Sequence, residues 1–266
     1  MFNFITSYPK SGNTWLRFII FEIYFRDMVS EISSDLVEKY VPDFHKKFNI
    51  ETRSLVLNPV LKNNEVFIKT HFSFEQMSSM KINKVLLVVR NPLDVIVSLV
   101  HYYNIDKNDI DSVVMDFSEN HTISRIKEKL KFPGLIEHHD SWINSKNEIL
   151  ILRYEDLVEN FNNTIIKLTK FLDKEIDDNK IEKIKLNTSF KIMKDMEKSE
   201  KQKKLEGAFR IPNSKKFFMN KGKSNGYFDV LNTDQIEKLR KAFSSFMKTY
   251  NYWITLRISI NWNSIF

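Results

Sequence analysis

Residues 8–15 read Tyr-Pro-Lys-Ser-Gly-Asn-Thr-Trp, a short polar loop whose residue types suit the binding of an anion. The residues before it, Phe2 to Thr6, alternate like a strand, and Trp15 to Phe25 are apolar enough for a buried helix. Between a strand and a helix, the backbone N–H groups of such a loop and of the helix N-terminus can bind a phosphate or sulfate. Lys10 adds an ammonium group that complements the anion and the helix dipole. The sequence therefore predicts an anion site here.

The loop departs from the Walker pattern G-x4-G-K-[ST] of nucleotide hydrolases. Gly12 and Thr14 match the pattern, but Ser7 stands at the first glycine and Asn13 at the lysine. A nucleotide hydrolase needs that lysine on the β and γ phosphates. Its absence indicates a phosphorylated ligand whose terminal group is handled differently.

The loop resembles the 5′-phosphosulfate loop of sulfotransferases that use 3′-phosphoadenosine 5′-phosphosulfate (PAPS), where Y-P-K-S-G-T-T-W is the common form. The resemblance extends in the family's order from residue 8 to about residue 237. The further matching segments are Lys69-Thr70-His71, Arg90 to Ser98, Tyr154-Glu155-Asp156-Leu157, Thr188 to Met193, and Lys221-Gly222 with Gly226. It implies a P-loop-type fold and the transfer of a sulfuryl group from PAPS to a hydroxyl or amine, without a metal.

Strand-like segments alternate with helical patterns along the chain. They are Phe2 to Thr6, Val66 to Lys69, Val85 to Val89 and Ile149 to Leu152. This alternation predicts a three-layer α/β/α fold with a central, mainly parallel sheet that binds ligands at the carboxyl ends of its strands. Lys10, His71, Arg90 and Tyr154 each come just after one of these segments. We therefore expect them to meet at one edge of the sheet.

The resemblance implies a catalytic role for His71, Lys10 and Lys69. A neutral His71 imidazole would take the proton of the acceptor hydroxyl, a contribution typically of about 10² to 10⁴ in rate. Lys10 and Lys69 would stabilise the charge that develops on the peripheral and leaving oxygens in a loose, in-line transition state.

The resemblance also implies a set of residues that bind the donor nucleotide. Lys10, Ser11, Gly12, Asn13 and Thr14 would bind its 5′ side, Trp15 would stack on adenine, and Arg90 and Ser98 would share the 3′-phosphate. Tyr154, Thr188 and Phe190 would lie on the adenine side, and Lys221 and Gly222 would close over the cofactor.

Local signals predict three further features. Asn91, followed by Pro92, is a natural N-cap for a helix through Tyr103. Asn232 or Thr233 should begin a helix through Phe246 with one buried face. The polar run from Lys194 to Lys216 shows little apolar periodicity, and we expect it to be a mobile lid.

Length and composition predict one globular domain over residues 1–266, with a tail at 252–266 to which no function is assigned. The 42% apolar and 13% aromatic content excludes a disordered chain, and the absence of cysteine excludes disulfides and thiol chemistry. The net charge of +7 comes mostly from lysines that alternate with acidic residues on solvated faces, so no nucleic-acid partner is expected. No membrane-spanning segment or signal peptide is visible, which predicts a cytoplasmic protein.

The sequence departs from the family in three places. Asn220 stands where the family usually has an arginine, so we expect one charged contact to the 3′-phosphate to be missing. Only seven residues precede Tyr8, which predicts an open acceptor site that fits a carbohydrate better than a flat phenol, unless loops 45–64 and 104–132 rebuild a wall. The family's dimerisation pattern fails around Phe228, so dimerisation by that route is not expected and the oligomeric state stays open.

Two other functions remain open at this stage, and the acceptor itself is not identified. A P-loop nucleotide or small-molecule kinase would need a Mg²⁺-binding carboxylate after a strand, for which Glu155 and Asp156 are the plausible source. A non-catalytic module that binds PAPS or polyanions would keep the pocket or the basic surface without the chemistry.

Overall fold

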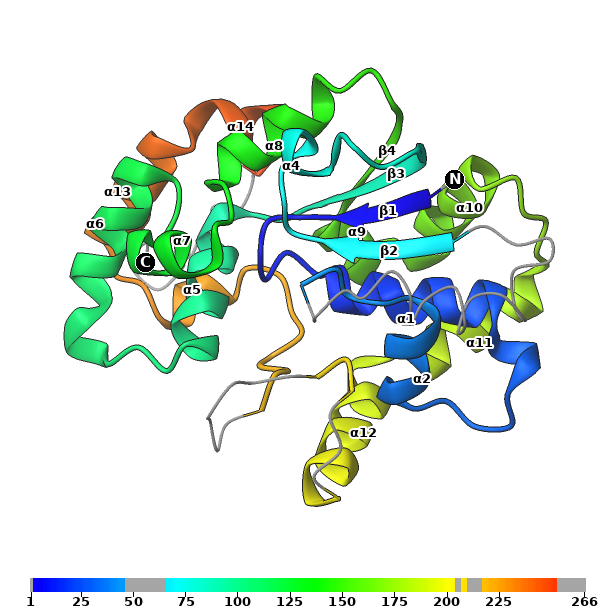
Figure 1. The fold of residues 1–266 in the computed structure, drawn as a ribbon. Helices are drawn as coiled ribbons and strands as arrows, with labels where there is room; N and C mark the ends of the chain where they lie inside the picture. The colour runs from blue at the N-terminus through cyan, green and yellow to red at the C-terminus, as the bar shows by residue number, and fades with distance from the viewer. Residues whose placement is uncertain (1, 46–65, 204–206, 210–216, 253–266) are drawn as a thin grey trace, which may run out of the picture.

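The computed structural model describes residues 2–45, 66–203, 207–209 and 217–252 (Figure 1). Its centre is a four-stranded sheet in the order β2-β1-β3-β4, with every neighbouring pair parallel. The strands are β1 (Phe2–Thr6), β2 (Val66–Thr70), β3 (Ile82–Val89) and β4 (Glu148–Arg153). All four predicted strands are present, three of them slightly longer than expected.

The register aligns the carboxyl ends of the strands at one edge of the sheet. Thr6, the last residue of β1, lies opposite Thr70 of β2 and Leu87 of β3, and Val89 lies opposite Arg153 of β4. The loop after β1 and the residue after β2 therefore begin next to each other, which places Lys10 and His71 at the same edge.

Successive strand residues point to opposite faces, and each face is covered by its own core. Phe4 and Leu87 belong to one hydrophobic cluster, whereas Ile5 and Leu86 belong to the other. Figure 1 shows the resulting layers. One side of the sheet is covered by α1 (Asn13–Tyr24), α2 (Ser34–Tyr40), α10 (Phe161–Phe171) and α11 (Asp178–Asn187), and the other by α5 (Pro92–Tyr102), α6 (Ile110–Asn120), α8 (Leu135–Ile143) and α13 (Thr233–Ala242). The predicted three-layer α/β/α arrangement is confirmed.

The helices before β4 are α1 (Asn13–Tyr24), α2 (Ser34–Tyr40), α4 (Phe74–Met77), α5 (Pro92–Tyr102), α6 (Ile110–Asn120), α7 (Ser124–Leu130) and α8 (Leu135–Ile143). Those after it are α9 (Tyr154–Glu159), α10 (Phe161–Phe171), α11 (Asp178–Asn187), α12 (Phe190–Gln202), α13 (Thr233–Ala242) and α14 (Ser244–Thr249). Short 3₁₀ turns occupy Arg26–Met28, Lys107–Asp109 and Gly226–Asp229. Within the described ranges, no helix is long and apolar enough to cross a membrane.

Both predicted N-caps are confirmed. The Asn91 side chain accepts the Leu93 backbone N–H at 3.0 Å with Pro92 in the first turn, and Asn232 forms a reciprocal capping box with Gln235. The helix expected to run unbroken through Phe246 instead divides into α13 and α14 at Phe243. The Phe243 ring is fully buried against Phe117, so core packing fixes the break.

The polar run from Lys194 to Lys216 is only partly as predicted, because its first part continues α12 as a regular helix through Gln202. Glu197 accepts the backbone N–H groups of Phe218 and Met219, and Glu200 accepts from the backbone and hydroxyl of Ser34. These acids were hidden in a lysine-rich pattern, yet each anchors α12 to another element. Positions 204–206 and 210–216 of the run, and 253–266 of the tail, lie outside the described residues.

Candidate active site

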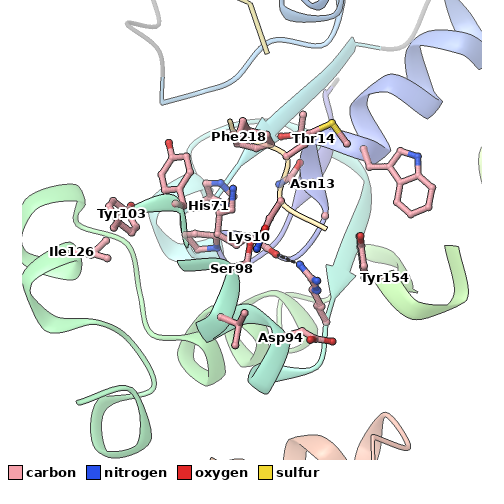
Figure 2. A pocket seen from close by; sticks show the side chains of 18 of the residues that line it. Lys10, Asn13, Thr14, His71, Asp94, Ser98, Tyr103, Ile126, Tyr154 and Phe218 are labelled. Carbon is pink, nitrogen blue, oxygen red and sulfur yellow. Dashed lines mark hydrogen bonds between the residues drawn. The ribbon is translucent and has the colours of Figure 1, made fainter. Parts of the chain in front are cut away.

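A cavity of about 1300 Å³ lies at the carboxyl edge of the sheet, and most of the predicted site residues line it (Figure 2). They are Lys10, Gly12, Asn13, Thr14, Trp15, Lys69, His71, Arg90, Ser98, Tyr154, Phe190, Lys221 and Gly222. They come from segments more than 200 residues apart in sequence, so the fold brings the predicted nucleotide-binding and catalytic residues to one space.

Two of the predicted residues do not line this cavity. Ser11 is buried and faces a small space on the other side of the loop, against Leu87 and His138. Thr188 is also buried, and its hydroxyl donates to the Ile184 carbonyl oxygen at 2.8 Å within its own helix. In this structure the Thr188 hydroxyl binds a backbone carbonyl at the end of its own helix. The sequence pattern alone could not distinguish this role from a ligand contact.

The loop after β1 contains two residues with a left-handed backbone. Lys10 has φ 69° and Gly12 has φ 109°, both in the left-handed region. A Cβ added at Gly12 would lie 2.5 Å from Cδ2 of Tyr154, so only glycine fits there.

Asn13, which stands at the Walker lysine position, has a structural role. Its side-chain amide donates to the carbonyl oxygens of Ile5 and Thr70 at 3.4 and 3.3 Å and to the Ser7 hydroxyl at 3.1 Å. These bonds tie the start of α1 to the ends of β1 and β2. Its amide nitrogen is therefore committed to the loop, whereas its Oδ1 is buried with no partner among the described residues. The donors that this loop can offer a ligand are then its backbone N–H groups.

The Lys10 ammonium lies between two aromatic rings. Its Nζ is 3.7 Å from the centre of the Phe218 ring and 4.2 Å from that of Tyr102. Burial, together with the nearby Arg90 guanidinium, lowers the pKa of Lys10 to about 7. Lys10 is thus a desolvated amine whose charged and neutral forms are near balance at pH 7. Lys10 and Ser98 both line the cavity and are labelled in Figure 2.

Arg90 links the loop to Tyr154 on the far side of the cavity. Its Nη1 donates to the Lys10 carbonyl oxygen at 3.0 Å, and its guanidinium lies 4.2 Å from the centre of the Tyr154 ring. Its Nε and the Trp15 Nε1 are buried donors with no partner among the described residues. Buried donors normally have a partner, so the cavity suits a ligand rich in acceptor oxygens.

His71 is held in one tautomer. Its Nδ1 lies 2.6 Å from the Ser7 carbonyl oxygen, and because a carbonyl only accepts, Nδ1 carries the proton. Burial, then the positive charge of Lys69, keeps the pKa of His71 well below its ordinary value. The imidazole is therefore neutral at physiological pH, with the Nε2 lone pair available as a base.

Lys69 is less available to stabilise charge on a ligand than the sequence suggested, because it already has an acidic partner. It is buried, and its Nζ forms an ion pair with Asp43 Oδ2 at 2.9 Å. Burial lowers the pKa of Lys69, and the Asp43 charge opposes that shift. Burial would raise the pKa of Asp43, but the Lys69 and Arg17 charges outweigh it and hold that pKa well below the ordinary range. The Lys69 charge is thus partly compensated by a residue that the sequence did not indicate.

Residues 218–227, here called the strap, carry Lys221 and Gly222 and are anchored at both ends. On one side Glu197 binds the backbone of Phe218 and Met219, and on the other Asp94 accepts the N–H groups of Asn225 and Tyr227 at 2.8 and 3.0 Å. Lys194 donates to the carbonyl oxygens of Met219 and Asn220. The side chain of Lys221 pairs with Asp229 at 2.7 Å in this state.

Aromatic and aliphatic side chains form the wall beside His71. Phe132 lies 5.4 Å from the His71 ring, and Ile105, Ile126 and Tyr103 also line the cavity. Figure 2 shows Tyr103 and Ile126 on the His71 side of Lys10, with Tyr154 on the other side. The sequence predicted an open acceptor site unless loops 45–64 and 104–132 rebuilt a wall, and residues of loop 104–132 do line the cavity. Positions 46–65 lie outside the described residues.

Sequence reasoning missed His45, which also lines the cavity and stacks on His71 with ring centres 5.5 Å apart and planes 19° apart. It lies in no helix or strand, so no periodic signal marked it. Across the described ranges, no group of three or more His, Cys, Asp or Glu side chains is arranged to hold a metal ion.

Comparison with known proteins identifies the family. The family described as "Sulfotransferase domain" matches residues 3–251. The chain is 24% identical over 251 residues to an amine sulfotransferase of Oryctolagus cuniculus (93% of this chain, 81% of the relative). It is 28% identical over 245 residues to sulfotransferase 1 family member D1 of Mus musculus (90% of this chain, 81% of the relative).

A solved mouse sulfotransferase, SULT7A1 complexed with PAP, has the same fold. Its TM-score is 0.64 at 22% identity, over 94% of this chain and 85% of that chain. With a family match over most of its length and a fold shared with a solved member, the chain belongs to the sulfotransferase domain family.

Proposed function

We propose that this protein transfers the sulfuryl group of PAPS to a hydroxyl or amine of a small acceptor. The observation that carries the proposal is the position of His71, a neutral imidazole in the same cavity as the anion loop of Lys10 and Gly12. A base and an anion site that share one space suit group transfer between an anionic donor and a protic acceptor.

The donor side of the cavity fits a nucleotide with two phosphate-bearing positions. The positive-φ loop at Gly12 and the ammonium of Lys10 suit the 5′ side, and Arg90 and Ser98 suit the 3′-phosphate. The buried, unpartnered Nε of Arg90 is a donor that such a phosphate would satisfy. The solved relative complexed with PAP, which is 3′,5′-bisphosphoadenosine, supports this choice of donor.

In the proposed reaction, the acceptor oxygen or nitrogen attacks sulfur as the bond from sulfur to the nucleotide oxygen breaks. His71 takes the acceptor proton at Nε2, while its Nδ1–H stays on the Ser7 carbonyl and fixes the ring. Lys10 would stabilise the charge that develops on the leaving oxygen. Its aromatic neighbours Tyr102 and Phe218 exclude water, which strengthens that interaction.

The acceptor side offers apolar surface to a small molecule. Phe132 lies against the His71 ring, and Ile105 and Ile126 line the same cavity, together with the polar side chains of Asn104, Asp106, Asp109, Arg125 and Lys129. The rabbit relative named an amine sulfotransferase supports keeping amines among the candidates. A phenol, an apolar alcohol or an apolar amine is the class that this wall fits.

The kinase alternative loses its metal-binding candidate. Glu155 is buried, accepts the Asn91 backbone N–H at 3.0 Å and does not line the cavity. Asp156 pairs with Arg153 at 3.2 Å. With Asn13 at the lysine position and neither Glu155 nor Asp156 lining the cavity, the kinase alternative is not favoured.

The test measures PAP formation from PAPS with three acceptors offered separately: 2-naphthol, a primary alkylamine and a chitin oligosaccharide. We expect PAP release above the acceptor-free rate with naphthol or the amine. Sulfation of the oligosaccharide alone would contradict the proposed acceptor class. Phosphoryl transfer from ATP to any of the three would contradict the proposed reaction.

A further inference from the structure

Residues 42–45 extend the sheet beyond β2 at the edge that carries the cavity. The Lys69 N–H donates to the Pro42 carbonyl oxygen at 2.9 Å, and the Phe44 N–H donates to the Lys69 carbonyl oxygen at 2.8 Å. This makes a parallel bridge in which Asp43 lies opposite Lys69. Side chains two residues apart share a face of an extended chain. His45 lies two residues after Asp43 and His71 lies two residues after Lys69, so the bridge brings the two histidines to the same face.

The two histidines are in direct contact. The His71 backbone N–H donates to His45 Nε2 at 2.7 Å, and the imidazole rings stack at 5.5 Å between centres. The His45 backbone N–H donates to Asp43 Oδ1 at 3.0 Å, while Oδ2 of the same carboxylate binds Lys69. One carboxylate thus orders both the lysine next to the base and the histidine beside it.

We propose that His45 is a positioning residue for His71. This proposal adds a residue role to the sulfotransferase function proposed above, and its kinetic consequences rest on that function. Position 71 follows the last residue of β2, and its backbone N–H donates to the His45 ring. The bond from His71 N–H to His45 holds its backbone, and the bond to Ser7 holds its ring, so that Nε2 keeps a fixed direction into the cavity.

The chemistry of His45 fits this role. To accept from the His71 N–H, Nε2 of His45 must be unprotonated. Burial, followed by the charge of Lys69, lowers the pKa of His45 to about 3, so the accepting form persists through the physiological range. Phe72 and Phe132 pack around its ring at 4.3 and 4.6 Å between centres, which fixes the ring and excludes water from the bond.

The test compares His45→Gln with His45→Asn. Both substitutions remove the ring and its stacking, but the Gln side-chain oxygen reaches the place of Nε2, whereas the Asn oxygen reaches only that of Nδ1. Any difference between them therefore reports the hydrogen bond to position 71. Three measurements apply to both variants: turnover with PAPS and 2-naphthol, PAP affinity by calorimetry, and the tautomer of His71 from ¹⁵N chemical shifts in the ligand-free protein.

We expect His45→Gln to keep turnover within about fivefold of the unmodified protein and His45→Asn to lose about tenfold more, the typical worth of one hydrogen bond. PAP affinity should stay within about threefold in both, because His45 does not touch the nucleotide side. Without the bond from position 45 the His71 backbone should shift, so that its Nδ1 leaves the Ser7 carbonyl oxygen for part of the time. In the Asn variant the ¹⁵N shifts should therefore show a mixture of His71 tautomers, which a merely structural role would not produce.

Equal turnover in the two variants, or one unchanged His71 tautomer in both, would overturn the positioning role. The ¹⁵N measurement needs no ligand, so it separates this inference from the proposed function. If the unmodified protein neither bound PAP nor used PAPS, the proposed function would fail, while the tautomer result would still decide whether His45 orders His71.

Discussion

The Nδ1 atom of His71 lies 2.6 Å from the carbonyl oxygen of Ser7, so the loop after β1 sets the tautomer of an imidazole that follows β2. The same loop continues into Lys10 and Gly12, which line the cavity and belong to the proposed anion site. Any shift of the anion loop would therefore also turn the base. The register of β1 and β2, with Thr6 opposite Thr70, is what makes this coupling possible.

His71→Ala should abolish most turnover with little effect on nucleotide binding. Loss of the base should cost about 10² to 10⁴ in rate, while PAP affinity stays within about threefold, because the imidazole acts on the acceptor proton. His121→Asn is the control, since His121 packs on Phe243 and does not line the cavity. Near-normal turnover by His71→Ala would show that another group is the base.

The pH profile should also reflect the state of His71. Its pKa is lowered well below the ordinary value, so the base is already deprotonated near neutral pH and turnover should not rise with a midpoint near 6.5. The fall in rate should come only at more acidic pH. A profile of kcat against pH measures this, and a midpoint at the ordinary histidine value that vanishes in His71→Gln would argue against the buried, neutral base.

Binding of PAP should take up a proton at Lys10. In the ligand-free protein the pKa of Lys10 is lowered to about 7, so at pH 8 most of the population is neutral. A bound anion favours the ammonium and raises that pKa, which requires proton uptake. Calorimetry at pH 8 in two buffers of different ionisation enthalpy should show this, and Lys10→Met should remove it. Heats independent of the buffer would count against Lys10 as the anion's partner.

Substitution by alanine should affect PAP affinity differently at two glycines of the strap. Gly222 has φ 61°, and an added Cβ would overlap the Phe190 ring, whereas at Gly226 the closest atom would be Asp94 Oδ1 at 3.6 Å, an ordinary contact. Gly222→Ala should therefore weaken PAP binding by about tenfold or more, because strain of about 1 to 3 kcal/mol must be relieved by moving the strap. Gly226→Ala, in the same strap, should change it little. Similar affinities for the two variants would remove the strap from the nucleotide site.

Arg90 should supply the preference for a 3′-phosphate. AMP lacks that phosphate, so the unmodified protein should bind PAP far more tightly than AMP. Arg90→Ala should lose affinity for PAP, by about 1.5 to 3 kcal/mol for a hydrogen bond to a charged group, and change little toward AMP. An equal loss toward both nucleotides would indicate that Arg90 only supports the loop through the Lys10 carbonyl, a bond that is present at 3.0 Å.

Much of the fold was predictable because its signals are local. Strand-length apolar runs marked β1 to β4, and Asn91 and Asn232 marked two helix starts by their capping chemistry. The helix break at Phe243 was not predictable, since it depends on a distant contact with Phe117. Nor was the extent of α12, whose anchoring residues Glu197 and Glu200 find their partners far away in sequence.

The residues of the site also divide into those that local signals predicted and those that they did not. Lys10, Arg90 and His71 follow strands, and the rule about strand ends was enough to group them. His45 and Asp43 follow no strand of their own and reach the site through a single bridge to Lys69, which no period or motif announces. The bonds that commit Asn13 and Thr188 to the backbone were equally hidden, because the same side chains can serve a ligand or a helix end.

The most direct test of the account is a calorimetric comparison of PAP with ATP, each without and with Mg²⁺. The cavity described by Lys10, Gly12 and Arg90 predicts that PAP binds without Mg²⁺ and at least about a hundredfold more tightly than ATP, a difference of about 2.7 kcal/mol. ATP binding as tight as that of PAP, or binding of either nucleotide that depends on Mg²⁺, would contradict it.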